Sequence, residues 1–102
     1  MSENVSLIER ELLSEGYIES EDFHRTYLKG EVCIKIRERL DDNIELERIV
    51  IHTTGDKRRK ISTAILLYNP HKEGELFCKG DYKSVCYLID ILRNALNYGN
   101  DN

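Results

Sequence analysis

The sequence predicts an α+β domain with an N-terminal helix, a four-stranded antiparallel meander sheet and a C-terminal helix, both helices packing on one face of the sheet. Three observations predict it. Apolar residues recur with helical spacing near both ends of the chain, they alternate with a period of two in between, and short polar turns separate the alternating runs. Such turns allow hairpins but no crossovers, so neighbouring strands should run antiparallel. The length of 102 residues fits a single domain over residues 1–102.

The first helix is predicted from Val5, Ile8 and Leu12, which follow one another at the spacing of one helix face. Ser2 can cap its start, because a serine hydroxyl accepts a hydrogen bond from a free backbone N–H. Gly16 is placed to end it, because glycine readily adopts the left-handed conformation that follows the last turn of many helices.

Residues 17–30 allow two interpretations. An acidic stretch typical of a helix start precedes Phe23 and Tyr27, which are four residues apart as on one helix face. Alternatively, Thr26–Lys29 already belong to the next strand. We expect a short helix or turn through about residue 26.

The next two runs predict a hairpin. Apolar and polar residues alternate over residues 31–40 and again over residues 44–52, with an Asp-Asp-Asn turn at residues 41–43 between them. A three-residue loop would place Leu40 opposite Ile44.

Opposite charges support this register. It places Arg39 opposite Glu45 and Arg37 opposite Glu47, so two ion pairs form on one face. A slip by one residue would move the apolar set to the other face. Arg48 is the exception, because it falls on the apolar side; it can pair with an acid at the sheet margin, or a bulge can intervene.

Two further strands and a helix complete the chain. Residues 55–59 read as a turn, residues 60–69 as the third strand and residues 75–79 as a short fourth strand. The last helix begins after an N-cap at Asp81 and should end at Gly99. Its apolar face has helical spacing and consists of Val85, Leu88, Ile89, Leu92 and Leu96.

The sheet has too many apolar residues for one covered face. Two helices can cover only one face, and Cys33, Lys35, Ile49 and Ile51 point to the other. An uncovered apolar middle on that face indicates a homodimer or a partner protein. The alternative is that the N-terminal segment wraps around and covers it.

The charge layout is uneven. The net charge of −4 and the pI of about 5.4 argue against a protein that coats nucleic acid with its whole surface. A local basic cluster can still bind phosphate. In a meander, one end of the sheet would gather Lys29, Lys57, Arg58, Arg59, Lys60, Lys79 and Lys83.

The sequence predicts no catalytic residue, no metal, no cofactor and no small-molecule substrate. Its scattered cysteines (Cys33, Cys78 and Cys86) and histidines lack the close spacing of metal ligands, and it has no nucleophile elbow or phosphate loop. A polar start and the absence of a long apolar run indicate no signal peptide and no membrane span. With unpaired cysteines, this favours a cytoplasmic location.

These observations give an order of hypotheses. A non-enzymatic binding or regulatory protein, acting through protein–protein contact and assembled as a homodimer, comes first. A nucleic-acid-binding domain that uses the predicted hairpin tip at Lys57–Lys60 comes second. An enzyme comes third.

Overall fold

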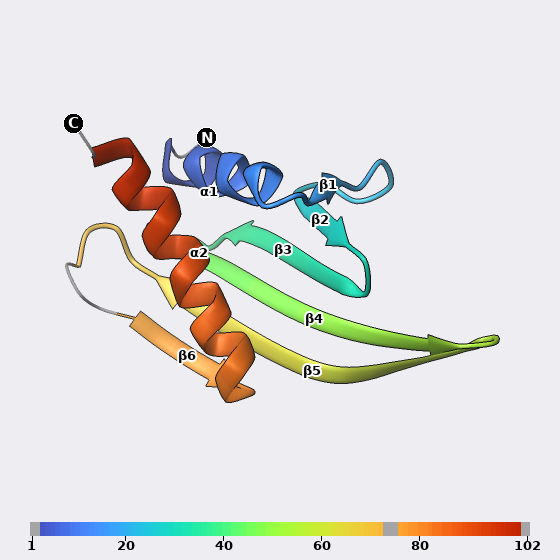
Figure 1. The fold of residues 1–102 in the computed structure, drawn as a ribbon. Helices are drawn as coiled ribbons and strands as arrows, with labels where there is room; N and C mark the ends of the chain where they lie inside the picture. The colour runs from blue at the N-terminus through green and yellow to red at the C-terminus, as the bar shows by residue number, and fades with distance from the viewer. Residues whose placement is uncertain (1–2, 73–75, 101–102) are drawn as a thin grey trace.

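The computed structural model describes residues 3–72 and 76–100. It confirms an α+β fold with a helix at each end and an antiparallel sheet between them, but the sheet has six strands, not four. The strands follow one another in space in chain order, as in a meander (Figure 1). The elements are α1 (Glu3–Ser14), β1 (Ile18–Glu19), β2 (Thr26–Lys29), β3 (Val32–Glu38), a 3₁₀ turn (Leu40–Asp42), β4 (Ile44–Thr54), β5 (Lys57–Tyr68), β6 (Leu76–Gly80) and α2 (Tyr82–Asn100).

The short helix predicted within residues 17–30 is wrong, because this segment forms β1 and β2. The four-residue spacing of Phe23 and Tyr27 does not mark a helix face: Tyr27 is buried and lies opposite Ile34 of β3, whereas Phe23 is exposed. The hydroxyl of Ser20, in what resembled a helix start, accepts the backbone N–H groups of the next turn instead.

The predicted register of the first long hairpin is shifted by two residues. Glu38, and not Leu40, lies opposite Ile44, because residues 40–42 turn as a 3₁₀ helix and lengthen the loop. A shift by two leaves every side chain on its predicted face.

The next turn is shorter than predicted. It consists of Gly55 and Asp56 alone, since Thr54 pairs directly with Lys57. Gly55 has a φ of +61°, which glycine adopts without strain. The basic residues 57–60 therefore lie inside β5 and not in a loop.

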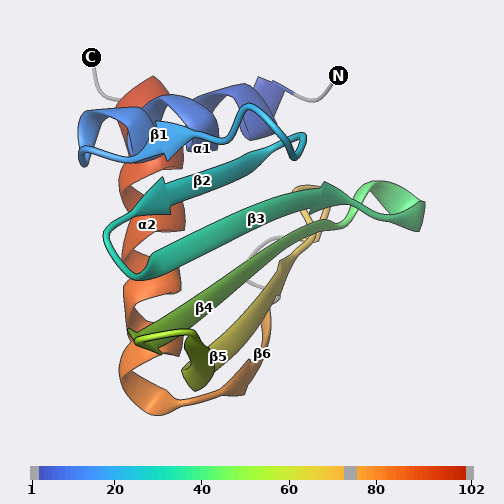
Figure 2. The ribbon, with the colours of Figure 1, turned by 90° about the vertical axis from the view of Figure 1, so that its right-hand side faces the viewer.

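The hairpin of β4 and β5 extends beyond its neighbours. β3 pairs with β4 only as far as Val50, and β6 pairs with β5 only from Ala64 onward. Residues 51–60, called the arm below, thus form a two-stranded ribbon that projects from the sheet (Figures 1 and 2). A register irregularity between Val50 and Ile51 marks its base.

The core lies between the helices and one face of the sheet (Figure 2). Both helices contribute buried apolar residues to it, and so do alternate residues of β3, β4 and β5. The core residues are Val5, Ile8, Leu12, Tyr17, Tyr27, Ile34, Ile36, Ile44, Leu46, Ala64, Leu66, Leu88, Ile91, Leu92 and Ala95.

The helix ends follow the predictions in part. Gly16 has a φ of +95°, and the backbone N–H of Tyr17 donates to the carbonyl of Leu12, which closes α1 as predicted. Asp81 caps α2 by accepting the N–H of Ser84 at 3.2 Å. The helix ends at Asn100, one residue beyond the predicted stop. The predicted cap Ser2 and the predicted first residue of the fourth strand, Glu75, lie outside the described residues.

Candidate functional site

The sheet face that points away from the helices, called the open face below, has a row of apolar residues that crosses four strands and ends at a threonine on the fifth. The pairing places Ile18, Leu28, Cys33, Ile49 and Thr63 side by side. Cys33 is 9% exposed and Ile49 6% exposed within the single chain. The middle of this face is therefore better covered than the sequence predicts, and its exposed apolar residues lie toward the edges.

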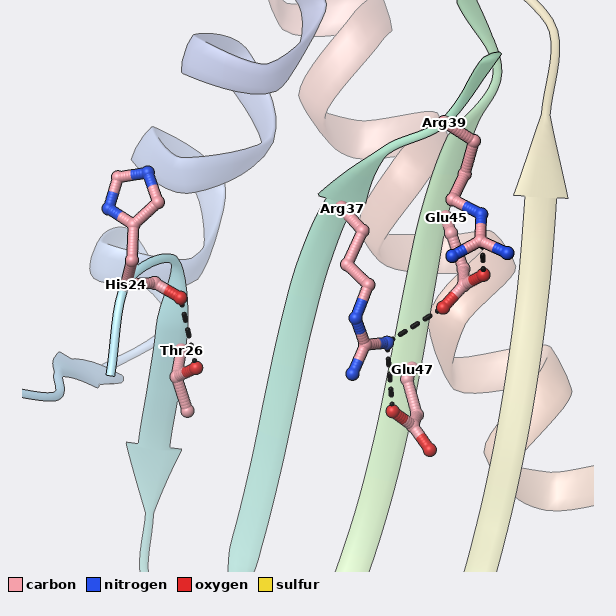
Figure 3. A network of polar contacts seen from close by, with 6 residues as sticks. All are labelled: His24, Thr26, Arg37, Arg39, Glu45 and Glu47. Atoms are coloured by element: carbon pink, nitrogen blue, oxygen red, sulfur yellow. Dashed lines mark hydrogen bonds and ion pairs between the residues drawn. The ribbon is translucent and has the colours of Figure 1, made fainter. Parts of the chain in front are cut away.

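A charge network covers one end of the open face (Figure 3). One guanidinium nitrogen of Arg37 donates to Glu45 at 2.7 Å and to Glu47 at 3.0 Å, and Arg39 lies 3.6 Å from the other oxygen of Glu45. The hydrogen bond to Glu47 is the main reason that the pKa of Arg37 is raised. Both predicted ion pairs thus exist, although the strand register differs.

The four basic residues of the arm have no such partners. Within the part of the chain that the structure describes, none of their side chains makes a hydrogen bond or an ion pair, and all four are exposed. Arg58 and Lys60 lie opposite Thr53 and Ile51 and so share the open side. Lys57 and Arg59 point to the other side, and cations therefore project from both faces of the ribbon.

A shallow groove of about 300 Å³ lies where the arm joins the open face. It brings together Cys33 and Ile51, predicted for the partner face, with Arg58 of the basic cluster. Sequence reasoning missed Leu28 and Thr53, which also line it. Both became identifiable only when residues 17–30 proved to be strands and the turn proved to be short.

The other predicted basic residues do not gather with the arm. The ammonium of Lys29 donates to the carbonyl of Glu15 at 2.6 Å and lies 5.6 Å from the centre of the Tyr17 ring.

Lys79 lies on the open face, where it pairs with Ile65 of β5. Ile65 is five residues along β5 from Lys60, a distance of about 17 Å at strand spacing. Lys83 lies in the first turn of α2. Lys35 lies on the open face opposite Glu47, as the alternation of side chains along the strand predicts.

Arg48 takes a position that the sequence did not indicate. It lies beneath α2, where it donates to the Ser84 hydroxyl at 2.7 Å and stacks 4.7 Å from the centre of the Tyr87 ring. Its Nε is buried without a hydrogen-bond partner among the described residues. Glu38 pairs with Arg25 instead, at 2.7 Å. Arg48 therefore links β4 to α2 through a hydroxyl and a ring.

Reactive side chains are dispersed in the described residues. All three cysteines are free, and burial raises the pKa of Cys33 and of Cys78, which keeps these thiols protonated at neutral pH. His52 lies 3.0 Å from Glu31, and His71 lies 3.0 Å from Asp42, both at the surface. No three histidine, cysteine or acidic side chains come together in the described residues as a metal site would require.

No family model matches this chain, and no significant similarity to a curated protein or to a solved structure is found. Among the described residues, neither helix has the length and apolar character needed to cross a membrane.

Proposed function

We propose that this chain is a non-enzymatic binding protein that docks its arm into a groove of a nucleic acid. One observation carries the proposal: four consecutive basic residues without internal partners project from both faces of an exposed two-stranded ribbon. Arg37 and Arg48, in neighbouring strands, bind partners within the chain, whereas these four cations are left available for an external anion.

The shape of the arm matches a groove better than a flat surface. A two-stranded ribbon fits the major groove of B-form DNA, and both walls of that groove carry phosphates. Lys57 and Arg59 would reach one wall, and Arg58 and Lys60 the other. A flat acidic protein surface would contact only one side of the ribbon and leave two cations unused.

The composition of the arm favours contacts to the backbone over reading of bases. It has no asparagine or glutamine to read adenine, and its tip carries Gly55 and Asp56 with no apolar side chain to wedge between bases. The carboxylate of Asp56 also opposes insertion of the tip. The net charge of −4 limits the contact to the arm, since the rest of the chain repels phosphate.

The test is binding of a fluorescent DNA duplex followed by anisotropy at increasing salt. We expect weak, sequence-tolerant binding with a salt slope between about −3 and −4, as four phosphate contacts predict. R58E/R59E should lose binding. R10E/R93E makes the same charge change at exposed helix positions outside the arm and should retain most of it. Absence of binding at low salt to duplex and single-stranded DNA and RNA would refute the proposal.

A second candidate function is assembly by protein–protein contact, which the sequence favoured first. Exposed apolar side chains at the edges of the sheet support it, with Ile18 and Leu28 at one edge and Leu76 and Phe77 at the other. The groove lined by Cys33 and Ile51 offers a further contact area. Sedimentation of the purified chain tests self-assembly, and a monomer at every concentration up to about 100 µM would refute a homodimer.

A further inference from the structure

β6 is the last strand of the sheet, and its outer side has no neighbouring strand among the described residues. Leu76 is 42% exposed and Phe77 58% exposed, and they lie on opposite faces of the strand. Native edge strands are usually protected by proline, bulges or several charges. β6 contains no proline, pairs with β5 without a bulge and carries Lys79 as its one charge.

The direction of the free backbone groups on β6 follows from one hydrogen bond. The N–H of Asp81, the residue that follows the strand, donates to the carbonyl of Thr63 in β5 at 3.0 Å. Backbone groups alternate in direction along a strand, so those of Phe77 and Lys79 also face β5. Those of Leu76, Cys78 and Gly80 point outward and are available to another strand.

We propose that β6 pairs antiparallel with β6 of a second copy of this chain, about a two-fold axis at Cys78. This inference deepens the second candidate function by naming the partner and the surface. The register joins the outward backbone groups of both strands and places Leu76 opposite Gly80 of the second copy. Phe77 then lies opposite Lys79 of the second copy, and the reverse pair repeats across the axis.

Self-complementarity favours a second copy over an unrelated strand. The large side chain of Leu76 faces Gly80 of the second copy, which has no side chain to clash with it. Each aromatic ring meets a lysine, whose stem packs on the ring while its ammonium stays in water. With the axis at Cys78, the Lys79 side chains of the two copies lie on opposite sides of the axis. An axis at Lys79 would instead place these two lysines opposite each other. β6 itself supplies both members of every pair.

The dimer should be weak. A five-residue strand buries a small area, and interfaces at the small end of the range dissociate readily. We therefore expect a dissociation constant of about 1–100 µM, measured by sedimentation without nucleic acid.

A charge-swap experiment tests the surface and the register together. F77K places lysines opposite each other twice and should weaken the dimer at least tenfold. Adding K79E places a glutamate opposite each new lysine, so F77K/K79E should restore dimerisation to within a few-fold of the original chain. I61K adds a lysine at an exposed apolar position of β5 outside β6 and should leave the dimer unchanged. Circular dichroism checks that each variant is folded.

Three results would overturn the proposal. A monomer throughout the range refutes the dimer, and a dimer that tolerates F77K refutes the β6 surface. Failure of F77K/K79E to recover refutes the register. None of these measurements contains nucleic acid, so their outcome is independent of whether the arm binds phosphate.

Discussion

The two halves of the β4–β5 hairpin differ in how their charges are used. In the half that lies within the sheet, Glu45 and Glu47 bind Arg37, and Arg48 binds Ser84. In the arm, the four cations of residues 57–60 have no partner among the described residues. One pair of strands thus contains a region in which charges fix the fold and a region in which they are left to solvent.

Paired and unpaired charges have different consequences for this chain. A paired charge reports on the stability of the fold, because its removal leaves a desolvated partner behind. An unpaired row of like charges repels itself and is free to meet an external anion, which is the basis of the proposal that the arm binds phosphate.

The largest contrast is expected between Leu66 and Ile61, two residues of the same strand. Leu66 is fully buried in the core, so L66A should lower the free energy of unfolding by about 2–5 kcal/mol. Ile61 is 57% exposed at the base of the arm, so I61A should change it by less than about 0.5 kcal/mol. Urea denaturation of both variants measures this. Similar losses would show that the two halves are one cooperative packing unit.

The helices and most strands could be predicted because their periodicity is local. Val5, Ile8 and Leu12 can share a face only in a helix, and the alternation around Ile34 fits only a strand. Residues 17–30 could not be assigned in this way, because the burial of Tyr27 depends on β3 and on α1, where Glu9 accepts its hydroxyl hydrogen bond. Such contacts between distant segments leave no mark on local spacing.

A smaller effect is expected from the charge network on the open face. R37M removes two charge-assisted hydrogen bonds and leaves Glu45 with the longer contact to Arg39, so it should cost about 1 kcal/mol. K35M is the matched control. Lys35 lies on the same face, and its side chain has no hydrogen bond or ion pair within the described residues. Equal urea midpoints for the two variants would show that the network does not stabilise the sheet.

The candidate site was predictable in type but not in place. The run of basic residues at 57–60 is evident in the sequence, and its composition is typical of a loop. The two-residue turn at Gly55 and Asp56 places this basic run in β5 instead. Lys60 therefore lies five residues along β5 from Ile65, the residue that pairs with Lys79. The position of Arg48 under α2 was not predictable, because its partner Ser84 is 36 residues away along the chain.

The last effect concerns pH, and it arises on the side of the sheet that the helices cover. Burial, followed by the hydrogen bond to Tyr87, raises the pKa of Tyr17. Burial, followed by the hydrogen bond to Glu9, raises the pKa of Tyr27. A tyrosine whose pKa is higher in the folded state stabilises the fold fully below its unfolded pKa of about 10, and this contribution is lost as the pH rises above that value.

The free energy of unfolding should therefore fall between about pH 10 and 11.5, and the fall should be shallower in Y17F and in Y27F. Y82F is the control, because Tyr82 is 80% exposed at the start of α2, so water screens the contact with Cys86 that raises its pKa. Urea denaturation at each pH gives the slopes. If Y82F flattened the profile as much as Y27F, alkaline destabilisation would not arise from the covered face. If Y17F and Y27F alone flattened it, the titration would separate the covered half of the molecule from the exposed arm, which carries no tyrosine.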